Sequence, residues 1–352
     1  MIPTFDKIHL KFKLNSTSYN HEELKEVSYS LIKEGEAYEK IIGNFLLDWL
    51  DEKDFLYVKT SGSTGNPKLI KVSKQAMVNS AIATGNRFKL SPGDTALHCL
   101  PTNFIAGKMM LVRAMILGLE LDIVEPSTLP AYDDEKPYKF CAMVPMQVQK
   151  SLKRLQNINT LIVGGAAVSK SLLKDIEPLK TKVFATYGMA ETLSHIAIKP
   201  LNNYKGEAHF KLLKDVKISQ DDRDCLVVEA PKLTDKTIVT NDIVKLYSKT
   251  EFEVIGRYDN MINSGGVKLF PEQIEAKLDG KINQRFFVAS QPDDTLVERV
   301  VLVLEGQSTE LDTAIFSDLE KYEVPKQILS VEQFAETSSK KIQRAKTLSK
   351  LN

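Results

Sequence analysis

The sequence contains few of the residues that hold metals or cross-link a chain. Its three cysteines, Cys99, Cys141 and Cys225, lie far apart, so they fit neither a disulfide framework nor a zinc-binding spacing. The five histidines form no pair with the spacing of metal ligands. We therefore expect a reducing compartment, cysteines that pack as small apolar residues, and no dedicated zinc site.

The chain also lacks a strong net charge and a long apolar run. Its formal charge is +1, so no global field attracts nucleic acid or an anionic membrane. The most apolar stretch, 109–124, is interrupted by Arg113, Glu120 and Asp122, and is too short and too charged to cross a bilayer. Residues 1–7 lack the basic-then-apolar pattern of a signal peptide. We expect a cytoplasmic protein without a membrane span or a nucleic-acid partner.

Strand-like and helix-like patterns alternate along most of the chain. With 352 residues, 43% of them hydrophobic, it is long enough for two domains with a sizeable core. From residue 73 to 188 the alternation predicts an α/β fold, in which parallel strands carry helices on both faces. After Gly206 the runs become short, which predicts a small, barrel-like antiparallel part with strands at 237–240 and 245–247.

The rest of the chain is predicted to be a compact α+β unit. It has helical patterns at 271–278 and 310–321. The change of pattern near residue 256 predicts a large domain over 1–256 and a small one over 257–352.

One short segment, 57–68, has the composition of a loop that wraps a polyphosphate. Glycines let backbone N–H groups approach phosphate oxygens, hydroxyls donate further hydrogen bonds, and a lysine supplies positive charge. Residues 55–58 predict a short strand, so the loop leaves a strand end, where α/β proteins place ligands. The candidate phosphate-binding residues are Thr60, Ser61, Gly62, Ser63, Thr64, Gly65 and Lys68.

This segment is not a Walker-type loop, which has the pattern G-x-x-x-x-G-K-[ST]. Counted from Gly62, Pro67 replaces the second glycine and Leu69 replaces the magnesium-binding hydroxyl, although Lys68 is in place. A surface loop rich in serine and glycine is the open alternative.

Four further segments follow in order. They are 187–191 (YGMAE), 240–242 (TND), 256–268 (GRYDNMINSGGVK) and 340–344 (KKIQR). Together with 60–68 they resemble the adenylate-forming superfamily of acyl-CoA synthetases, peptide-synthetase adenylation domains and luciferases. The resemblance implies an enzyme that joins a carboxylate to the α-phosphate of ATP and then passes the acyl group to coenzyme A. ATP, Mg²⁺ and coenzyme A are the implied cosubstrates and metal.

The resemblance implies how the first step is catalysed. Because this step brings an anion onto a polyanion, we expect charge neutralisation and positioning to dominate. Lys341 stands in the position of the family's C-terminal catalytic lysine, over the α-phosphate. Glu191 stands in that of the magnesium-anchoring carboxylate, and the loop 60–68 would hold the β- and γ-phosphates.

The nucleoside contacts are implied in the same way. Asp242 would accept both ribose hydroxyls with the help of Arg257. Gly165, Ala166 and Tyr187 would flank the adenine. A lone Asp242 after a strand is more often a turn or cap residue, and a lone Tyr187 more often belongs to a core. The joint order of the motifs favours the family.

The resemblance also implies a mobile C-terminal lid. Asp259 falls at the hinge on which this lid turns, and Gly265 and Gly266 would then meet the pantetheine of coenzyme A. A plain turn at Gly265–Gly266, and a solvated helix end for the lysines around Lys341, are the simpler alternatives.

Residues 100–113 most closely resemble o-succinylbenzoate–CoA ligases of menaquinone synthesis. Arg113 matches an arginine of these ligases that is expected to recognise the benzoate carboxylate. A cation on an otherwise apolar helix needs an anionic partner if it is buried. An ion pair of Arg113 with Glu120 or Asp122 is the structural alternative, and Lys108 is a second candidate for the same role.

Gly188 and Ser194 complete the expected substrate contacts, together with Phe104. Three positions depart from the family: Phe104 replaces a gating histidine, Ala190 a threonine and Lys340 a glycine. None of these changes removes an indispensable charge. The region before the phosphate loop is shorter than in most relatives, which puts the family's dimer surface in doubt and leaves a homodimer open.

Two other functions stay open. One is a ligase for another aromatic or fatty acid, or one that loads a carrier protein. A long fatty acid would need an apolar tunnel, with which a buried Arg113 conflicts. The other is a non-catalytic adenylate-binding protein, against which the retention of Lys341, Glu191 and Asp242 argues.

Overall fold

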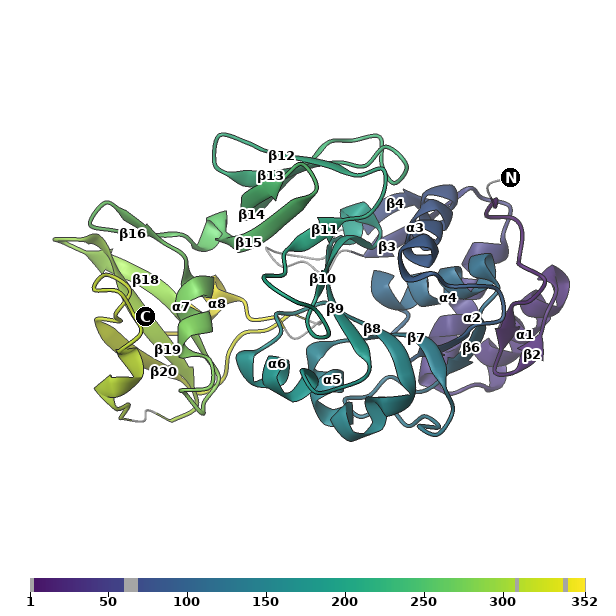
Figure 1. The fold of residues 1–352 in the computed structure, drawn as a ribbon, viewed down its shortest axis with the longest axis horizontal. Helices are drawn as coiled ribbons and strands as arrows, with labels where there is room; N and C mark the ends of the chain where they lie inside the picture. The colour runs from purple at the N-terminus through teal and green to yellow at the C-terminus, as the bar shows by residue number, and fades with distance from the viewer. Residues whose placement is uncertain (1–2, 60–68, 308–309, 338–340, 352) are drawn as a thin grey trace.

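The computed structural model describes residues 3–59, 69–307, 310–337 and 341–351. A 13-stranded sheet and a 5-stranded sheet organise these residues, with a separate two-stranded hairpin. Figure 1 shows the N-terminal helices and the smaller sheet at opposite ends of the molecule.

Five neighbouring strands of the large sheet are parallel, as the alternation along the chain predicts. On β7, Phe140 and Ala142 enter one hydrophobic cluster, whereas Cys141 and Met143 enter another, so both faces are buried. In spatial order the strands are β9 (Lys182–Gly188), β8 (Ile158–Val163), β7 (Tyr138–Met143), β5 (Thr95–His98) and β6 (Glu120–Ile123).

Helices cover both faces of these strands. The first cluster includes apolar side chains from α1 (His21–Glu34), α2 (Ala37–Leu50), α3 (Lys74–Phe88) and α4 (Ile105–Leu117). The second takes up α5 (Pro145–Ser151), the 3-10 helix η1 (Leu152–Asn157) and α6 (Lys170–Ile176). Across the described ranges, no helix has the length and apolar character needed to span a membrane.

Further strands extend the large sheet at both ends. At one end are β10 (His195–Pro200), β11 (Phe210–Leu212), β15 (Glu251–Arg257), β14 (Ile238–Ser248), β13 (Cys225–Glu229) and β12 (Lys217–Gln220), all antiparallel. At the other, β1 (Lys13–Leu14) joins β6 and pairs with β2 (Thr17–Ser18). The prediction of two separate strands at 237–240 and 245–247 is wrong, because residues 238–248 form the single strand β14. Asn241 and Asp242 suggest a turn by type, yet Asp242 pairs opposite Arg257 within the sheet.

The strand predicted at 55–58 is confirmed as β3 (Phe55–Lys59), which pairs with β4 (Leu69–Ser73) in the separate hairpin. Ser73 then caps α3 by accepting a hydrogen bond from the amide of Ala76 at 3.4 Å. The candidate phosphate loop 60–68 connects β3 to β4 in the chain and lies outside the described residues.

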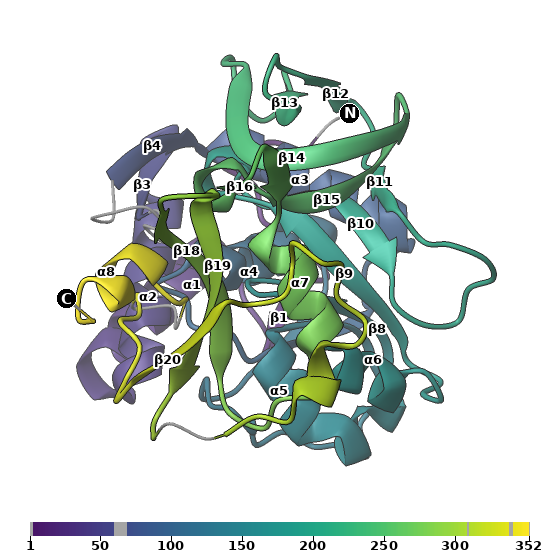
Figure 2. The ribbon, with the colours of Figure 1, turned by 90° about the vertical axis from the view of Figure 1, so that its left-hand side faces the viewer.

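The C-terminal part of the chain forms the smaller sheet. Its elements are η3 (Tyr258–Asn260), β16 (Ile262–Ser264), β17 (Val267–Leu269), α7 (Pro271–Leu278), β18 (Phe286–Asp293), β19 (Val297–Glu305), η4 (Thr313–Phe316), β20 (Gln327–Val331) and α8 (Arg344–Leu348). The helix predicted at 271–278 is confirmed. In Figure 2 this part faces the viewer, in front of the parallel strands. The predicted domain boundary at 256–257 falls just before the last residue of β15, the final strand that the chain adds to the large sheet, and stays a prediction.

The helix predicted over 310–321 is wrong, because only the 3-10 turn η4 forms there. The apolar side chains at 311, 315, 316 and 319 have helical spacing and do pack against the C-terminal core. Asp312, however, accepts the amide of Ala314 at 2.9 Å. Such a local side-chain contact favours a tight turn over a longer helix.

The C-terminal part contacts the large sheet's layer through α7. The carboxylate of Asp279, which follows α7, accepts a hydrogen bond from the backbone N–H of Lys170 at 2.5 Å. Lys170 is the first residue of α6, and Ser169 caps the same end by accepting the amide of Leu172 at 3.1 Å. Asp279 therefore places negative charge at the positive end of a helix that belongs to the other part of the molecule.

Lys74, at the start of α3, is a fully buried charge. Its Nζ lies 2.7 Å from Asp51 Oδ1 and 3.0 Å from the Asp51 carbonyl oxygen. The side chain of Lys74 is 0% exposed and that of Asp51 is 34% exposed. The pair fastens the end of α2 to the start of α3.

Removal of either partner of this pair should have unequal effects on stability. Asp51→Ala leaves a buried ammonium without its carboxylate, which should cost about 3 kcal/mol. Lys74→Met leaves a carboxylate that water reaches, and should cost about 1 kcal/mol. Thermal unfolding measures both, and Lys53→Met, which removes an exposed partner of Asp51, is the control. A larger loss for Lys74→Met than for Asp51→Ala would contradict this account.

Candidate active site

Three of the candidate nucleotide residues lie together where β9, β14 and β15 approach one another. Tyr187 Oη donates to Asp242 Oδ2 at 2.6 Å, and Arg257 Nη1 donates to Asp242 Oδ1 at 2.9 Å. Burial and the charge of Asp242 raise the pKa of Tyr187, so its phenol remains a hydrogen-bond donor. Asp242 is thereby held in one orientation as a charged acceptor.

The glycine segment after β8 lies at the carboxyl end of the parallel strands. A Cβ on Gly164 would lie 2.4 Å from Thr186 Oγ1 of β9, and Gly165 has a φ of +86°. A side chain is therefore excluded at the first position and strained at the second. Gly165 and Ala166 are exposed beside the strand that carries Tyr187, which is where open α/β sheets bind ligands.

Arg257 also connects this corner to the candidate hinge. Its Nη2 donates to Asp259 Oδ2 at 2.9 Å, while its Nη1 holds Asp242. The side-chain amide of Asn241 donates to Asp259 Oδ1 at 3.0 Å. The candidate hinge residue is thus tied to β14 and β15 in this conformation.

Lys341 lies close enough to this corner to interact with its charges. Burial lowers the pKa of Lys341, the charge of Arg257 lowers it further, and the charge of Asp242 opposes both. Arg344, the first residue of α8, anchors the chain just after Lys341. Its Nη1 donates to the Val288 carbonyl at 2.7 Å and pairs with Glu275 at 2.9 Å. The C-terminal lysine therefore lies within electrostatic range of two of the predicted ribose residues.

Arg113 is buried in α4 without a carboxylate partner among the described residues. It is 2% exposed, and burial lowers its pKa to about 9. Its Nη2 donates to Ser194 Oγ at 2.6 Å and its Nε to Thr84 Oγ1 at 3.3 Å. A third contact, from Nη1, goes to the sulfur of Met110 at 3.7 Å. Two of the five guanidinium N–H groups thus have no acceptor within the described ranges.

The structural alternative for Arg113 is wrong. Glu120 pairs with Lys13 at 2.8 Å, and Asp122 pairs with Lys136 at 2.6 Å. Both carboxylates therefore have other cations as partners.

Gly188 brings Ser194 to Arg113. A Cβ on Gly188 would lie 2.2 Å from the carbonyl oxygen of Ser194, so only glycine allows this close approach of β9 and β10. Leu193, with a φ of 64°, turns the chain just before Ser194. The candidate substrate residues Gly188, at the end of β9, and Ser194 are thus in contact, and Ser194 accepts a hydrogen bond from the guanidinium.

Lys108 and Phe104 lie elsewhere along the same helix. The ammonium of Lys108 lies 4.7 Å from the centre of the Phe45 ring of α2, and burial lowers its pKa. Phe104 is half-buried at the N-terminal end of α4. These contacts favour Arg113 over Lys108 for an acid-binding role.

The remaining candidates that the structure describes are exposed. Glu191 lies in the short 3-10 helix η2 (Ala190–Thr192), with its side chain exposed to solvent. Gly265 and Gly266 form the turn between β16 and β17, with φ of +60° and +84°. The seven phosphate-loop candidates and Lys340 lie outside the described residues.

Two polar residues near Arg113 are absent from the sequence-based list. Nothing in the sequence around Thr84 indicates a functional role. Its hydroxyl also bonds to the Ser80 carbonyl, as the hydroxyls of many helical threonines do. His195 is adjacent to Ser194 in the chain, and its Nδ1 lies 3.3 Å from Ser194 Oγ. In the sequence, only its position next to the candidate Ser194 pointed to His195.

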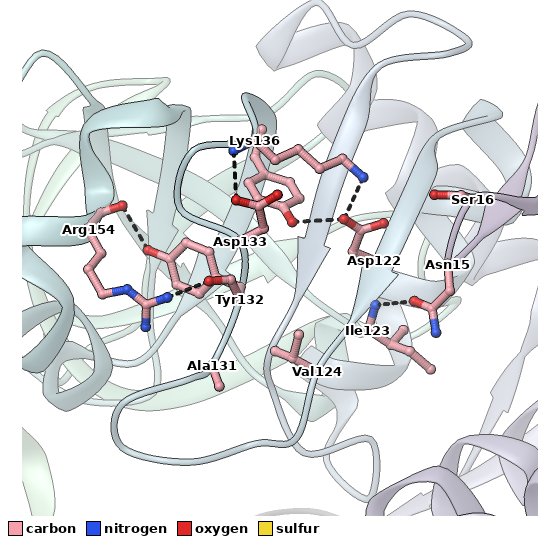
Figure 3. A pocket seen from close by; sticks show the side chains of 11 residues that line it. Asn15, Ser16, Asp122, Ile123, Val124, Ala131, Tyr132, Asp133, Lys136 and Arg154 are labelled. Carbon is pink, nitrogen blue, oxygen red and sulfur yellow. Dashed lines mark hydrogen bonds and ion pairs between the residues drawn. The ribbon is translucent and has the colours of Figure 1, made fainter.

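A hollow of about 520 Å³ lies near β6 and the turn after β1, at the edge of the parallel strands opposite β9. Figure 3 shows Lys136 directed at Asp122, and Arg154 beside Tyr132. Both of its cations already have carboxylate partners, because Lys136 pairs with Asp122 at 2.6 Å and Arg154 pairs with Asp134 at 3.1 Å. It contains none of the predicted site residues.

Comparison with known proteins identifies the family. The family model for AMP-binding enzymes matches residues 11–223, which is more than half of the chain. The chain belongs to the AMP-binding enzyme family. The family suggested by the ordered motifs is thereby confirmed.

Relatives of this AMP-binding enzyme include acid–CoA ligases. It is 26% identical to the 2-succinylbenzoate–CoA ligase of Listeria monocytogenes, over 91% of this chain and 74% of the ligase. It is 36% identical to a solved acyl-CoA synthetase (AMP-forming)/AMP-acid ligase II-like protein from Dyadobacter fermentans, with a TM-score of 0.62 over 93% and 98% of the two chains. The o-succinylbenzoate CoA synthetase of Bacillus subtilis, solved with its acyl-adenylate intermediate, has a TM-score of 0.78 over 95% and 94% at 15% identity. These structures confirm the predicted fold class.

Buried histidines should make the stability of this enzyme depend on pH. Burial lowers the pKa of His98 to about 4, and burial with the charge of Arg113 lowers that of His195 to about 3. Both are protonated more readily in the unfolded chain, so their stabilising effect is complete above about pH 6.5 and is lost as the pH falls. The loss should be about 2 kcal/mol per histidine between about pH 7 and about pH 5.

Unfolding temperatures across this range test the expectation. His98→Gln should make the fall in Tm shallower than in the wild-type protein. His21→Gln, a change at a surface histidine of α1, should leave the fall unaltered. If His98→Gln and the wild type lost stability in parallel, other groups would be responsible.

Proposed function

We propose that this protein is an AMP-forming acid–thiol ligase that activates o-succinylbenzoate with ATP and transfers it to coenzyme A, in menaquinone biosynthesis. The family and the acid–CoA ligases among its relatives support the AMP-forming acyl-CoA ligase class. The choice of acid rests on one observation, the buried guanidinium of Arg113 that lacks a carboxylate among the described residues.

The argument for the acid is electrostatic. A buried cation without a partner destabilises a protein by several kcal/mol, so its retention calls for an anion that arrives with a ligand. The o-succinylbenzoate molecule has two carboxylates: the aliphatic one would react, and the benzoate would pair with Arg113. A fatty acid or a simple benzoate has only the reacting carboxylate and would leave Arg113 unpaired.

ATP would bind where Asp242, Tyr187 and Arg257 meet. Asp242 is already oriented by two donors and would accept the ribose hydroxyls with its remaining lone pairs. Gly165 and Ala166 would flank the adenine at the carboxyl end of β8. The phosphate loop 60–68 follows β3 in the chain and would hold the β- and γ-phosphates.

Glu191 is suited to hold Mg²⁺. Its carboxylate is exposed, and Mg²⁺ commonly binds through one or two carboxylates plus substrate phosphates and water. The part of the chain that the structure describes has no cluster of three or more His, Cys, Asp or Glu that could hold a metal alone. When bound, the metal would neutralise charge on the phosphates.

Lys341 would act on the reacting groups. A carboxylate oxygen of the acid attacks the α-phosphorus of ATP, a new P–O bond forms, and the bond to the pyrophosphate oxygen breaks. Lys341 would neutralise the negative charge that gathers there. The thiol sulfur of coenzyme A then attacks the acyl carbon, the thiol proton leaves, and AMP departs with its oxygen.

The position of Lys341 relative to the large domain fits the first step of the proposed reaction, in which the acid is joined to AMP. Lys341 interacts with Asp242 and Arg257 here, far along the chain from both. We place the hinge at Asp259 between a large domain over 1–256 and a lid over 257–352. Rotation about this hinge would withdraw Lys341 and bring the Gly265–Gly266 turn to the thiol.

Arg113→Met should separate acid recognition from folding. Loss of the charged contact should raise KM for o-succinylbenzoate by roughly tenfold to a hundredfold, with little change in KM for ATP. KM for 4-oxo-4-phenylbutanoate, the same acid without the benzoate carboxylate, should not rise. Because the variant removes an unpaired buried charge, it should unfold at or above the wild-type Tm.

Substrate-dependent ATP–pyrophosphate exchange measures these constants. Wild-type exchange that is strong only with simple benzoates or fatty acids would overturn the choice of acid. Exchange with no acid at all would point to a non-catalytic adenylate-binding protein. If Arg113→Met unfolds, Arg113 is structural.

Lys341→Ala should affect the two half-reactions differently. Adenylation should fall by at least about a hundredfold, because a charge on the reacting phosphate is lost. Thioester formation from supplied acyl-adenylate should keep most of its rate, because the lid has by then withdrawn this residue. Lys346→Ala, on the exposed face of α8, is the matched control. Equal loss in both half-reactions would contradict the rotating lid.

A further inference from the structure

His195 extends the contacts of Arg113 by one residue. Ser194 Oγ accepts a hydrogen bond from Arg113 Nη2 at 2.6 Å and lies 3.3 Å from His195 Nδ1. His195 is 6% exposed, and Arg113 is 2% exposed. The three side chains therefore form a short chain of hydrogen bonds that begins at the imidazole and ends at the guanidinium.

The direction of the first hydrogen bond follows from the chemistry of the groups, and that of the second depends on which imidazole nitrogen carries the proton. A guanidinium can only donate, so Ser194 Oγ must be the acceptor of Arg113. The hydroxyl proton of Ser194 is then free to point to His195 Nδ1, which accepts it in the neutral tautomer that has no proton on Nδ1. The ring proton is in that case on Nε2, which is buried and has no partner among the described residues.

The surroundings keep His195 neutral. Burial and the positive charge of Arg113 both disfavour the imidazolium, which agrees with its lowered pKa. The ring of Phe88 from α3 lies near the imidazole, with ring centres 6.4 Å apart. Neutrality has a consequence for Arg113: the chain of hydrogen bonds orients its guanidinium without cancelling its charge. An aspartate or glutamate in this place would orient the guanidinium and also neutralise it.

We propose that His195 is a positioning residue that selects acids with a second carboxylate, by holding Ser194 against Arg113 as a neutral hydrogen-bond acceptor. This inference rests on the proposed function, because it concerns the same acid-binding residues. A fixed guanidinium that keeps its full charge presents its remaining N–H groups to an incoming carboxylate. Such preorganisation lowers the cost of binding a diacid and does nothing for an acid with one carboxylate.

Three substitutions at this position separate the possible roles. His195→Asn keeps an acceptor near the place of Nδ1, His195→Leu removes it, and His195→Asp has the shape of asparagine but carries a negative charge. The readout is the ratio of kcat/KM for o-succinylbenzoate to that for 4-oxo-4-phenylbutanoate, with the KM and kcat of each acid. His98→Leu, a change at another buried histidine, controls for effects on folding alone.

The expected pattern is specific. His195→Asn should keep the wild-type ratio within about threefold, and His195→Leu should lower it roughly tenfold. His195→Asp should lower it roughly a hundredfold, because a charged partner competes with the benzoate. The change should lie in KM for o-succinylbenzoate, with the kcat for 4-oxo-4-phenylbutanoate unaltered. His98→Leu should lower Tm and leave the ratio as it is.

Other results would overturn the inference. A wild-type ratio retained by His195→Leu and His195→Asp would show that His195 does not act on Arg113, while the proposed function would stand. An equal loss with His195→Asn and His195→Leu would show that the acceptor is not the operative feature. If the wild-type enzyme itself did not prefer o-succinylbenzoate, the proposed function would fail and this inference with it.

Discussion

The structure depends on the guanidinium of Arg257, which is shared between two carboxylates. One side holds Asp242 on β14, and the other holds Asp259 just after β15 ends. The first carboxylate belongs to the candidate nucleotide site, which it forms with Tyr187 and Arg257, and the second belongs to the turn that leads into the C-terminal part. The C-terminal part, which carries Lys341, is therefore joined to the large sheet by a residue that also orients Asp242, in addition to the contact of Asp279 with α6. Arg257 therefore contributes both to the candidate nucleotide site and to the attachment of the C-terminal part.

Two buried cations of the large sheet's layer illustrate how structural and functional charges differ. Lys74 has its carboxylate, Asp51, and the pair joins two helices. Arg113 is equally buried, yet a hydroxyl, a threonine oxygen and a thioether sulfur are its contacts. Neutral partners orient a charge without satisfying it. The first arrangement joins two elements of the fold, and the second leaves the positive charge of Arg113 without a carboxylate among the described residues, which is the basis of the proposed acid site.

The parallel core and α7 follow from local patterns, because apolar periodicity and a proline at a helix start are properties of the sequence alone. The long strand β14 does not, since the polar pair at 241–242 resembles a turn until Arg257 pairs opposite it. The burial of Arg113 was suggested by its apolar helix, but its separation from Glu120 and Asp122 depends on tertiary contacts with Lys13 and Lys136. His195 escaped notice because one histidine beside a serine carries no information until a guanidinium is packed against both.

The contact between Asp279 and the first amide of α6 has a consequence for the energetics of turnover. It joins the two parts of the molecule only while they are in the present arrangement. Lys170 is exposed, so water can replace the carboxylate as soon as the parts separate. The exchange of one hydrogen bond for hydration changes the free energy little. In the proposed rotation of the lid, this contact would therefore favour neither arrangement strongly.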